Sequence, residues 1–289
     1  METSYDVVVI GAGPAGLSAA TQAAQAGLRT LCLDKLAPGG ALINLTHLHN
    51  VEDAADGPTI AARLSDAATE AGVELGFGEV TQLSGSAPWA VETAEGERHT
   101  ARSVVIASGL AKGRLGVDGE EDYEGRGVSH CASCDGPLYA GQPVVVVGAA
   151  NWGWQEAEEL KSFTDDVTVV DPAPPTGTGG MRCIAGRIVA LEGSNGLESV
   201  VVETDGARKI LPASGAFVYV GRAPAAEFVP DSLARDASGH IVVDDEGRTS
   251  VASAFAVGDI RLGARQSLAE AIADGERAGR AIAKALGES

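Results

Sequence analysis

A glycine-rich turn near the start of the chain constrains the fold more than any other feature. An apolar run at residues 7–10 leads into a turn with Gly11, Gly13 and Gly16, and an alanine-rich helix is expected over residues 17–26. Between a buried strand and a helix, G-x-G-x-x-G indicates a nucleotide-binding βαβ unit. The first glycine permits the turn, the second lets a pyrophosphate approach the backbone, and the third lets the helix pack on the strand. The helix N-terminus then favours the anion.

The residues that follow extend this interpretation. A second strand over residues 29–33 ends at Asp34, where a carboxylate is placed to bond the hydroxyls of a ribose. Small residues at Ala107, Ser108 and Gly109 close a later strand, as if a cofactor passed close to the backbone. The alternative, a glycine-rich turn without a ligand, fits this context less well.

A second strand–turn–helix unit begins at residues 143–148, with a helix expected over residues 152–161. Its fingerprint is incomplete, because Ala150 stands where the glycine facing a pyrophosphate is expected. Trp152 and Trp154 follow, and we expect these rings to fill a nucleotide site rather than serve one. The Pro/Gly-rich residues 172–180 predict that the usual crossover helix is missing.

Two of the four cysteines, Cys131 and Cys134, form a C-x-x-C motif followed directly by Asp135. This spacing allows a disulfide or a shared metal. In a chain with βαβ patterns it indicates first a redox pair, in which one thiolate attacks a disulfide and the other resolves the mixed intermediate. A zinc site with His130 as third ligand lacks an evident fourth. Cys32 and Cys183 are expected to be structural.

Composition excludes several classes of protein. The 289 residues suffice for two domains, and a formal net charge of −19 argues against nucleic acid and anionic membranes as partners. No apolar run approaches a membrane span, and the N-terminus lacks the basic region of a signal peptide, so we expect a cytoplasmic protein. His47 and His49 are expected to be loop histidines, so no metal site is predicted.

Further along the chain, an amphipathic helix is expected over residues 59–71, a strand over residues 241–243 and a long helix over residues 267–286. The pattern predicts an α/β fold of two nested Rossmann-like domains, with parallel sheets in a three-layer architecture.

In the order and spacing of its motifs, the chain resembles the low-molecular-weight thioredoxin reductases over nearly its whole length. The matching motifs lie at residues 11–16, 39–42, 107–109, 131–136, 258–259 and 265–266. The resemblance implies an FAD-binding domain made of residues 1–114 and 239–289, a central NAD(P)-type domain of residues 115–238 that carries the cysteines, and a homodimer. It also implies a thioredoxin-like protein or a small-molecule disulfide as partner.

The resemblance also assigns roles to residues. Cys134 would exchange electrons with the flavin, Cys131 would attack the partner disulfide, and Asp135 would serve the thiols as acid or base. Asp34 would hold the ribose, and Asp259 the ribityl or phosphate end of the flavin. Ala41 stands where the family usually has glutamine. The implied FAD contacts are Gly11, Gly13, Pro14, Ala15, Gly16, Asp34, Gly40, Ala41, Leu42, Asn50, Val80, Ala107, Ser108, Gly109, Gly258, Asp259, Arg265, Gln266 and Ser267.

The chain departs from the family at the site for the pyridine nucleotide. The family places an arginine pair after the second strand of the central domain to neutralise the 2′-phosphate of NADPH, whereas this chain has Asp171 followed by Pro172-Ala173-Pro174. We therefore expect a donor other than NADPH, such as ferredoxin or an unknown one. A conventional NADPH enzyme, a dithiol oxidase that passes electrons to oxygen and a non-catalytic FAD- or metal-binding module are the alternatives. Asp135 weighs against the oxidase, because those relatives tend to have histidine there.

Overall fold

The computed structural model describes residues 3–44, 56–148, 152–175, 180–265 and 267–287, and the chain divides into two compact units. Unit 1 contains residues 1–111 and 223–289, and unit 2 contains residues 112–222. Residues 223–238, which the sequence places in the central domain, belong to unit 1, because Val229 and Leu233 are buried in its core. Among the described residues, no helix is both long enough and apolar enough to cross a membrane.

Unit 1 is built on a sheet in the order β3-β2-β1-β6-β5-β4. Strands β1, β2, β3 and β6 run parallel, whereas β5 and β4 continue the sheet antiparallel. The bounds are β1 Thr3–Ile10, β2 Thr30–Asp34, β3 Glu74–Phe77, β4 Val80–Gly85, β5 Trp89–Thr93, β6 Arg98–Ile106 and β17 Ala254–Ala256. The edge of β6 that faces away from β1 has two partners. Residues 98–101 pair antiparallel with β5, and residues 104–106 pair in parallel with β17.

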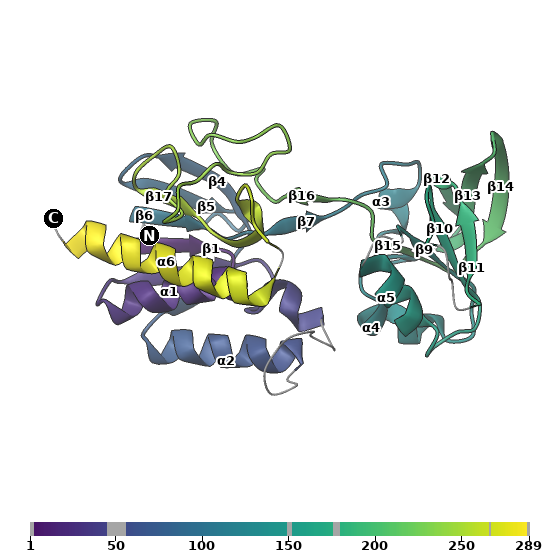
Figure 1. The fold of residues 1–289 in the computed structure, drawn as a ribbon, viewed down its shortest axis with the longest axis horizontal. Helices are drawn as coiled ribbons and strands as arrows, with labels where there is room; N and C mark the ends of the chain where they lie inside the picture. Colours follow the sequence, from purple (N-terminus) through teal and green to yellow (C-terminus); the bar gives the residue numbers. More distant parts are fainter. Residues whose placement is uncertain (1–2, 45–55, 149–151, 176–179, 266, 288–289) are drawn as a thin grey trace. The chain divides into compact units, whose positions relative to one another are not determined.

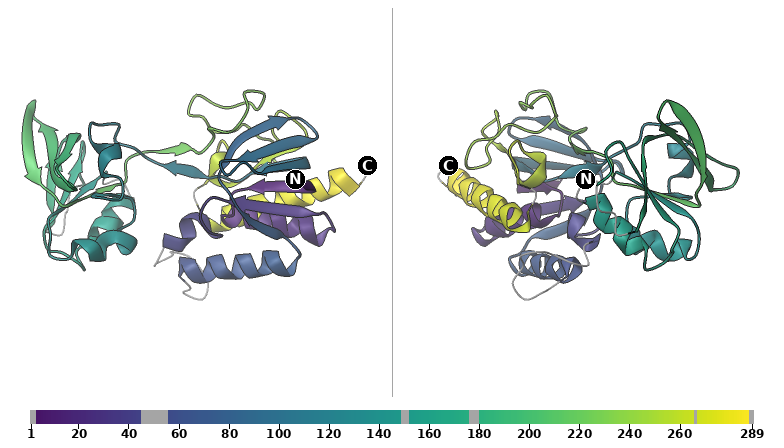
Figure 2. Two further views of the ribbon diagram at one scale, coloured as in Figure 1. Left: turned by 180° about the vertical axis from the view of Figure 1, so that it is seen from behind. Right: turned by 45° about the vertical axis from the view of Figure 1, so that its right-hand side comes forward.

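Three helices cover one face of this sheet: α1 (Pro14–Gln25), α2 (Gly57–Glu70) and α6 (Leu268–Gly287), as Figures 1 and 2 show. The alternation of β1 explains the layers, because Val7 and Val9 face the helices while Val8 and Ile10 face the opposite core. That opposite core contains residues of β4 and β5 together with residues 226–241. The short 3₁₀ segments are η1 Gly40–Asn44 and η4 Gly258–Ile260.

Residues 241–243, expected to form a strand, do not form one. Ile241 makes only isolated bridges to Arg235 and Arg261, and it is fully buried. Its apolar pattern reflects burial in a loop layer rather than a place in a sheet, a distinction that periodicity alone does not make.

Unit 2 repeats the three-layer plan. Its central sheet has the order β11-β10-β9-β15-β8, with parallel pairing throughout, and a separate antiparallel sheet has the order β12-β13-β14. Helix α5 (Trp152–Leu160) packs on one face of the central sheet, and β12 and β13 pack on the other (Figure 1). The strands are β8 Val128–Ser129, β9 Val144–Val147, β10 Val167–Asp171, β11 Arg182–Ala185, β12 Arg187–Gly193, β13 Leu197–Thr204, β14 Ala207–Pro212 and β15 Gly215–Val218.

The remaining elements of unit 2 are short: α3 Glu120–Tyr123, α4 Ala132–Asp135 and η3 Gly136–Tyr139. The described residues between β10 and β11 form no helix, as the Pro/Gly-rich sequence predicts. The two units are connected by β7 (Leu110–Lys112) and β16 (Arg222–Pro224), which pair with each other. The predicted α/β class with parallel sheets is confirmed in both units.

Candidate active site

The first glycine turn joins β1 to α1 with almost no side-chain volume. Gly11 has a φ of +105°, and a Cβ there would lie 2.4 Å from the carbonyl oxygen of Ala107. A Cβ on Gly16 would lie 1.9 Å from the carbonyl oxygen of Gly11. These two glycines are therefore required by packing of the strand, the helix and the neighbouring strand end.

Gly13 differs from its two neighbours. It is the N-cap of α1, no side chain caps the helix there, and a Cβ at Gly13 would meet nothing within 4 Å. The space over the first turn of α1 is therefore open, and helix N-terminal amides favour an anion there. Pro14 occupies the first turn, where its missing N–H costs nothing. The turn thus fits the pyrophosphate of a dinucleotide.

Asp34 is fixed beside this turn. Its Oδ2 accepts a hydrogen bond from the Ala12 amide at 2.8 Å, and its Oδ1 accepts one from the Leu36 amide at 3.0 Å. Each carboxylate oxygen keeps a further lone pair, which a ribose hydroxyl can use. The amide of Gly78 donates to the Asp34 carbonyl at 2.9 Å, and Val80, two residues later, begins β4.

The segment after β2 returns to the turn. The Gly39 amide donates to the carbonyl of Ala12 at 2.7 Å, and a Cβ on Gly40 would lie 3.1 Å from the Cα of Gly13. Leu42 is buried against α2, whereas Ala41 is exposed. Gly40 therefore borders the open space at Gly13.

Two other segments complete the cluster in unit 1. The amide of Ala107 donates to the carbonyl of Ile10, and the hydroxyl of Ser108 donates to the carbonyl of Ala225 at 2.7 Å, so residues 107–109 run beside Gly11. Gly258, in η4, approaches the start of α1, because a Cβ there would lie 2.9 Å from the Cβ of Ala15. Asp259 follows it directly and is partly buried.

Asp274, which no sequence motif marks, anchors this last segment. The Asp274 carboxylate is 3% exposed and accepts hydrogen bonds from Arg261, Arg277 and the amide of Gly258. Nothing in the helical periodicity of α6 distinguishes it from an ordinary surface acid, since its arginine partner lies 13 residues earlier.

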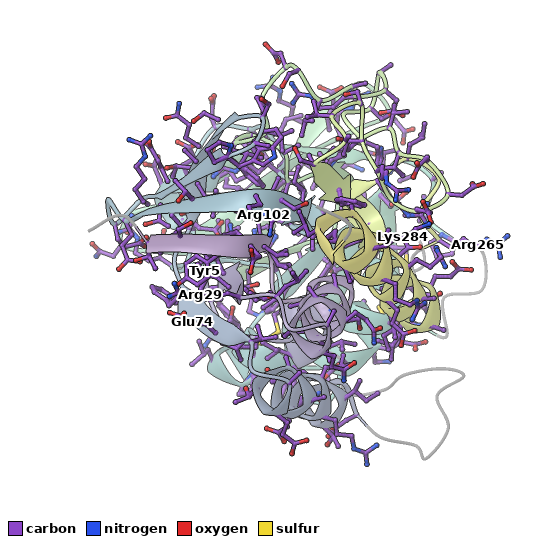
Figure 3. The ribbon with its side chains drawn as sticks, turned by 90° about the vertical axis from the view of Figure 1, so that its left-hand side faces the viewer. Tyr5, Arg29, Glu74, Arg102, Arg265 and Lys284 are labelled. Atoms are coloured by element: carbon purple, nitrogen blue, oxygen red, sulfur yellow. A yellow bond between two sulfur atoms is a disulfide. The ribbon has the colours of Figure 1, made fainter. Side chains whose placement is uncertain are left out.

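The remaining expected cofactor residues either contact the start of α6 or lie outside the described residues. The Arg265 side chain is 83% exposed, and Figure 3 shows it extending away from the ribbon, within 3.7 Å of Glu270. The Ser267 hydroxyl accepts a hydrogen bond from the Glu270 amide at the start of α6. Asn50 and Gln266 lie outside the described residues, as do His47 and His49.

In unit 2, Cys131 and Cys134 form a disulfide. Cys131 is the N-cap of α4, and its Sγ accepts a hydrogen bond from the Cys134 amide at 3.2 Å. Residue Cys131 is 7% exposed, whereas Cys134 is exposed to solvent. The predicted spacing thus yields one covered and one accessible cysteine on a single turn.

The Asp135 carboxylate is held near the pair by Ser129, whose hydroxyl donates to Oδ2 at 2.7 Å. The same hydroxyl oxygen accepts from the Cys131 amide at 3.2 Å, so Ser129 links the acid to the cysteine backbone. His130 contacts the carbonyl oxygen of Val218 at 3.1 Å through Nδ1 and lies 3.5 Å from Glu124 through Nε2. Among the residues that the structure describes, no group of three His, Cys, Asp or Glu is placed to hold a metal.

The second glycine turn repeats the packing of the first. Gly148 has a φ of +90°, and a Cβ there would lie 2.7 Å from the Tyr219 carbonyl oxygen. A Cβ on Gly153 would lie 1.8 Å from the Gly148 carbonyl oxygen. Gly148 and Gly153 thus correspond to Gly11 and Gly16, while Ala150 lies outside the described residues.

Trp154, which was expected to fill a nucleotide site, is partly buried. It packs against the core between α5 and the central sheet, and its Nε1 donates to Glu158 at 2.9 Å. The side chain of Trp152 is not described. Asp171 ends β10, where its Oδ1 accepts a hydrogen bond from the Ala173 amide at 2.8 Å.

Comparison with known proteins identifies the family. Residues 5–275 match the model of the pyridine nucleotide-disulphide oxidoreductases. The thioredoxin reductase of Treponema pallidum is 34% identical over 98% of this chain and 97% of its own length. That of Listeria innocua is 31% identical over 99% of this chain and 95% of its own length. The solved thioredoxin reductase of Lactococcus lactis has a TM-score of 0.89, at 31% identity and with 99% and 100% of the two chains covered.

Full-length coverage by both sequence and structure, together with the two glycine turns and the disulfide, supports a flavin cofactor and the predicted two-Rossmann-domain fold. The chain belongs to the pyridine nucleotide-disulphide oxidoreductase family and, within it, to the thioredoxin reductases, which are flavin-dependent disulfide oxidoreductases.

Proposed function

We propose that this chain is an FAD-dependent thiol–disulfide oxidoreductase whose Cys131–Cys134 pair carries electrons between FAD and a partner disulfide. The observation that carries this proposal is the disulfide itself, which lies on one turn with the Asp135 carboxylate. A two-electron disulfide on an exposed turn suits exchange with another disulfide. The partner we propose is a thioredoxin-like protein or a small-molecule disulfide.

FAD is the flavin that the residues of unit 1 fit best, because only a dinucleotide has a pyrophosphate for the open turn at Gly13 and an adenosine ribose for Asp34. Gly11 and Gly16 shape the turn, and Gly258 and Asp259 approach from the C-terminal segment. We further propose that Arg265, Gln266, Ser267 and Asn50 contribute to the same site. Bound there, the flavin supplies the two electrons that open the disulfide.

The chemistry of the cysteine pair balances in three steps. Two electrons and two protons convert the disulfide to two thiols. The Cys131 thiolate then bonds to one sulfur of the partner disulfide while the other partner sulfur leaves. Finally Cys134 attacks the Cys131 sulfur, re-forms the pair and releases the partner as a dithiol. Asp135 holds the proton that the thiols give up and returns it to the leaving sulfur.

The exposures of the cysteines bear on these roles. Cys134 is open to approach by a flavin, as its role requires. Cys131 is covered in the disulfide, so its attack on a partner requires that its sulfur be uncovered after the bond opens. The single-cysteine variants described below separate the two roles.

The electron donor that we propose is not NADPH but ferredoxin or another, unknown donor. Asp171 stands where the 2′-phosphate of NADPH would lie, its carboxylate is fixed by the Ala173 amide, and residues 172–180 contain no arginine. Like charges at that site disfavour binding. Against this, Gly148 and Gly153 keep the packing of a nucleotide turn, so a conventional NADPH enzyme is the second candidate.

An anaerobic titration tests the donor. The yellow holoenzyme is mixed with NADPH, NADH, reduced ferredoxin or dithiothreitol, and loss of flavin absorbance is followed by stopped flow. We expect dithiothreitol and the true donor to bleach the flavin and NADPH to do so poorly. Complete bleaching within about a second at micromolar NADPH would make the chain an ordinary thioredoxin reductase. Rapid reoxidation by oxygen coupled to dithiol consumption would favour the oxidase.

The cysteine roles are tested by single substitutions. Cys134→Ser is expected to leave FAD bound and to stop electron transfer from flavin to the partner disulfide. Cys131→Ser is expected to leave the Cys134 thiolate beside the flavin, visible as a long-wavelength absorption band. Full disulfide reductase activity in both variants would show that the pair is structural. Size-exclusion chromatography with light scattering tests the proposed homodimer.

A further inference from the structure

Glu156, in α5, carries a buried carboxylate that the proposed chemistry does not use. The residue is 9% exposed. Its Oε2 accepts two hydrogen bonds, from the Ala132 amide at 2.9 Å and from the Tyr219 hydroxyl at 2.7 Å. A buried carboxylate is costly unless donors compensate it, and these two donors do so.

The Ala132 amide belongs to the peptide bond that joins Cys131 to α4. Glu156 accepts a hydrogen bond from this amide, although the two residues are 24 positions apart in the sequence. The bond fixes the peptide next to Cys131. The amide is then no longer available to stabilise a negative charge on the Cys131 sulfur. The carboxylate itself lies one peptide unit from that cysteine, where a like charge opposes formation of a thiolate.

Tyr219 limits this effect. Burial raises the pKa of its phenol well above the usual range, and the neighbouring charge of Glu156 raises it further. The phenol therefore stays protonated and donates to Glu156 throughout the physiological pH range. It offsets part of the negative charge that the cysteine pair experiences.

The other titratable groups that the structure describes near the pair are acids, a phenol and one histidine. Asp135 adds a second carboxylate, whose neighbour Tyr139 has a pKa raised by burial and by Asp135. Glu159, also in α5, acts on Tyr219. His130 is engaged with a carbonyl oxygen and with Glu124. Most of these described groups are therefore acidic.

We propose that Glu156 is a positioning residue for the cysteine pair, which fixes the backbone at Ala132 and, with its charge moderated by Tyr219, disfavours the thiolate of Cys131 and so favours the disulfide over the dithiol. The inference rests on the proposed dithiol chemistry. It differs from the role of Glu120, another buried acid in unit 2, whose oxygens accept from the amides of Leu115 and Gly116 in its own loop.

Glu156→Gln tests the charge, because the amide oxygen still accepts from Ala132 and Tyr219 while the negative charge is lost. The full-length holoenzyme is equilibrated with glutathione redox buffers, quenched and analysed by mass spectrometry for the state of Cys131 and Cys134. Alkylation of the reduced enzyme as a function of pH gives the pKa of the Cys131 thiol. We expect that pKa to fall by about one unit. At a pH above the pKa values of the thiol in both proteins, this change moves the equilibrium roughly tenfold toward the dithiol, which corresponds to about 30 mV.

Tyr219→Phe is the matched variant and should act in the opposite direction, because it removes a donor and leaves the charge of Glu156 less compensated. Circular dichroism and flavin absorbance verify that both variants fold. Shifts of opposite sign support the inference. An unchanged pKa and equilibrium in Glu156→Gln, or shifts of the same sign in both variants, would overturn it. A wild-type pair that glutathione and dithiothreitol do not reduce would instead overturn the proposed function as well.

Discussion

Replacing Gly13 with alanine separates binding of FAD from folding of its site. At Gly13 the backbone has φ −73° and ψ −179°, a conformation that alanine adopts without strain, and the added Cβ meets no atom within 4 Å. Alanine is a poorer N-cap than glycine, at a cost of about 1 kcal/mol, but it stabilises the protein by about 0.4–1 kcal/mol because it lowers the entropy of the unfolded chain. The two effects nearly offset each other. We therefore expect the free energy of unfolding of the apoprotein to change by less than about 1 kcal/mol.

The same Cβ lies in the open space over α1 that the pyrophosphate is proposed to occupy. Hydrogen bonds to charged groups contribute about 1.5–3 kcal/mol each, so losing one or two corresponds to a roughly 10- to 10⁴-fold weaker affinity for FAD. Quenching of FAD fluorescence measures the affinity, and urea unfolding of the apoprotein measures stability. Wild-type affinity in Gly13→Ala would refute our placement of the pyrophosphate.

Gly16→Ala serves as the control, because its Cβ would lie 1.9 Å from the carbonyl oxygen of Gly11. There the packing of α1 on the sheet is itself disturbed. We expect this variant to lose both stability and FAD affinity, in contrast to Gly13→Ala. If both variants behaved alike, the two glycines would not have the separate roles that the structure gives them.

Two further predictions concern buried groups. Asp274→Ala leaves Arg261 and Arg277 without their shared carboxylate, so we expect the free energy of unfolding to fall by about 3–5 kcal/mol and FAD to be retained less well. Asp274→Asn should lose less stability. Equal urea midpoints for Asp274→Ala and wild type would contradict this prediction. Burial raises the pKa of the Cys32 thiol far above its usual value, so the native protein should not be alkylated there even at pH 9, whereas the urea-unfolded chain should be, as peptide mass spectrometry can show.

Features encoded within a few adjacent residues were predictable from the sequence. The turn at Gly11 to Gly16 combines a buried strand, three glycines and a helix, and the structure assigns a separate packing role to Gly11 and Gly16. The same holds for the disulfide of Cys131 and Cys134, whose spacing fits a single turn. Such patterns carry their own geometry, so little long-range information is needed.

Features that depend on contacts between distant residues were not predictable. The packing of Trp154 against the core beside the central sheet was not expected, because periodicity over so short a helix does not indicate it. The contact of Glu156 with the Ala132 amide joins residues in different elements. The core role of Val229 and Leu233 also escaped notice, because a loop that covers a sheet has no period of its own.

The paired strands β7 and β16 have a consequence for how this protein can change over time. The chain leaves unit 1 along β7 and re-enters it along β16, next to the point of departure. Unit 2 is therefore an insertion whose two ends meet, and unit 1 needs only a short hairpin to be complete without it. Substitutions in unit 2, such as those around Asp171, can accumulate without disturbing the fold that surrounds Gly13. A change of electron donor, as proposed above, therefore requires no change in the residues around Gly13.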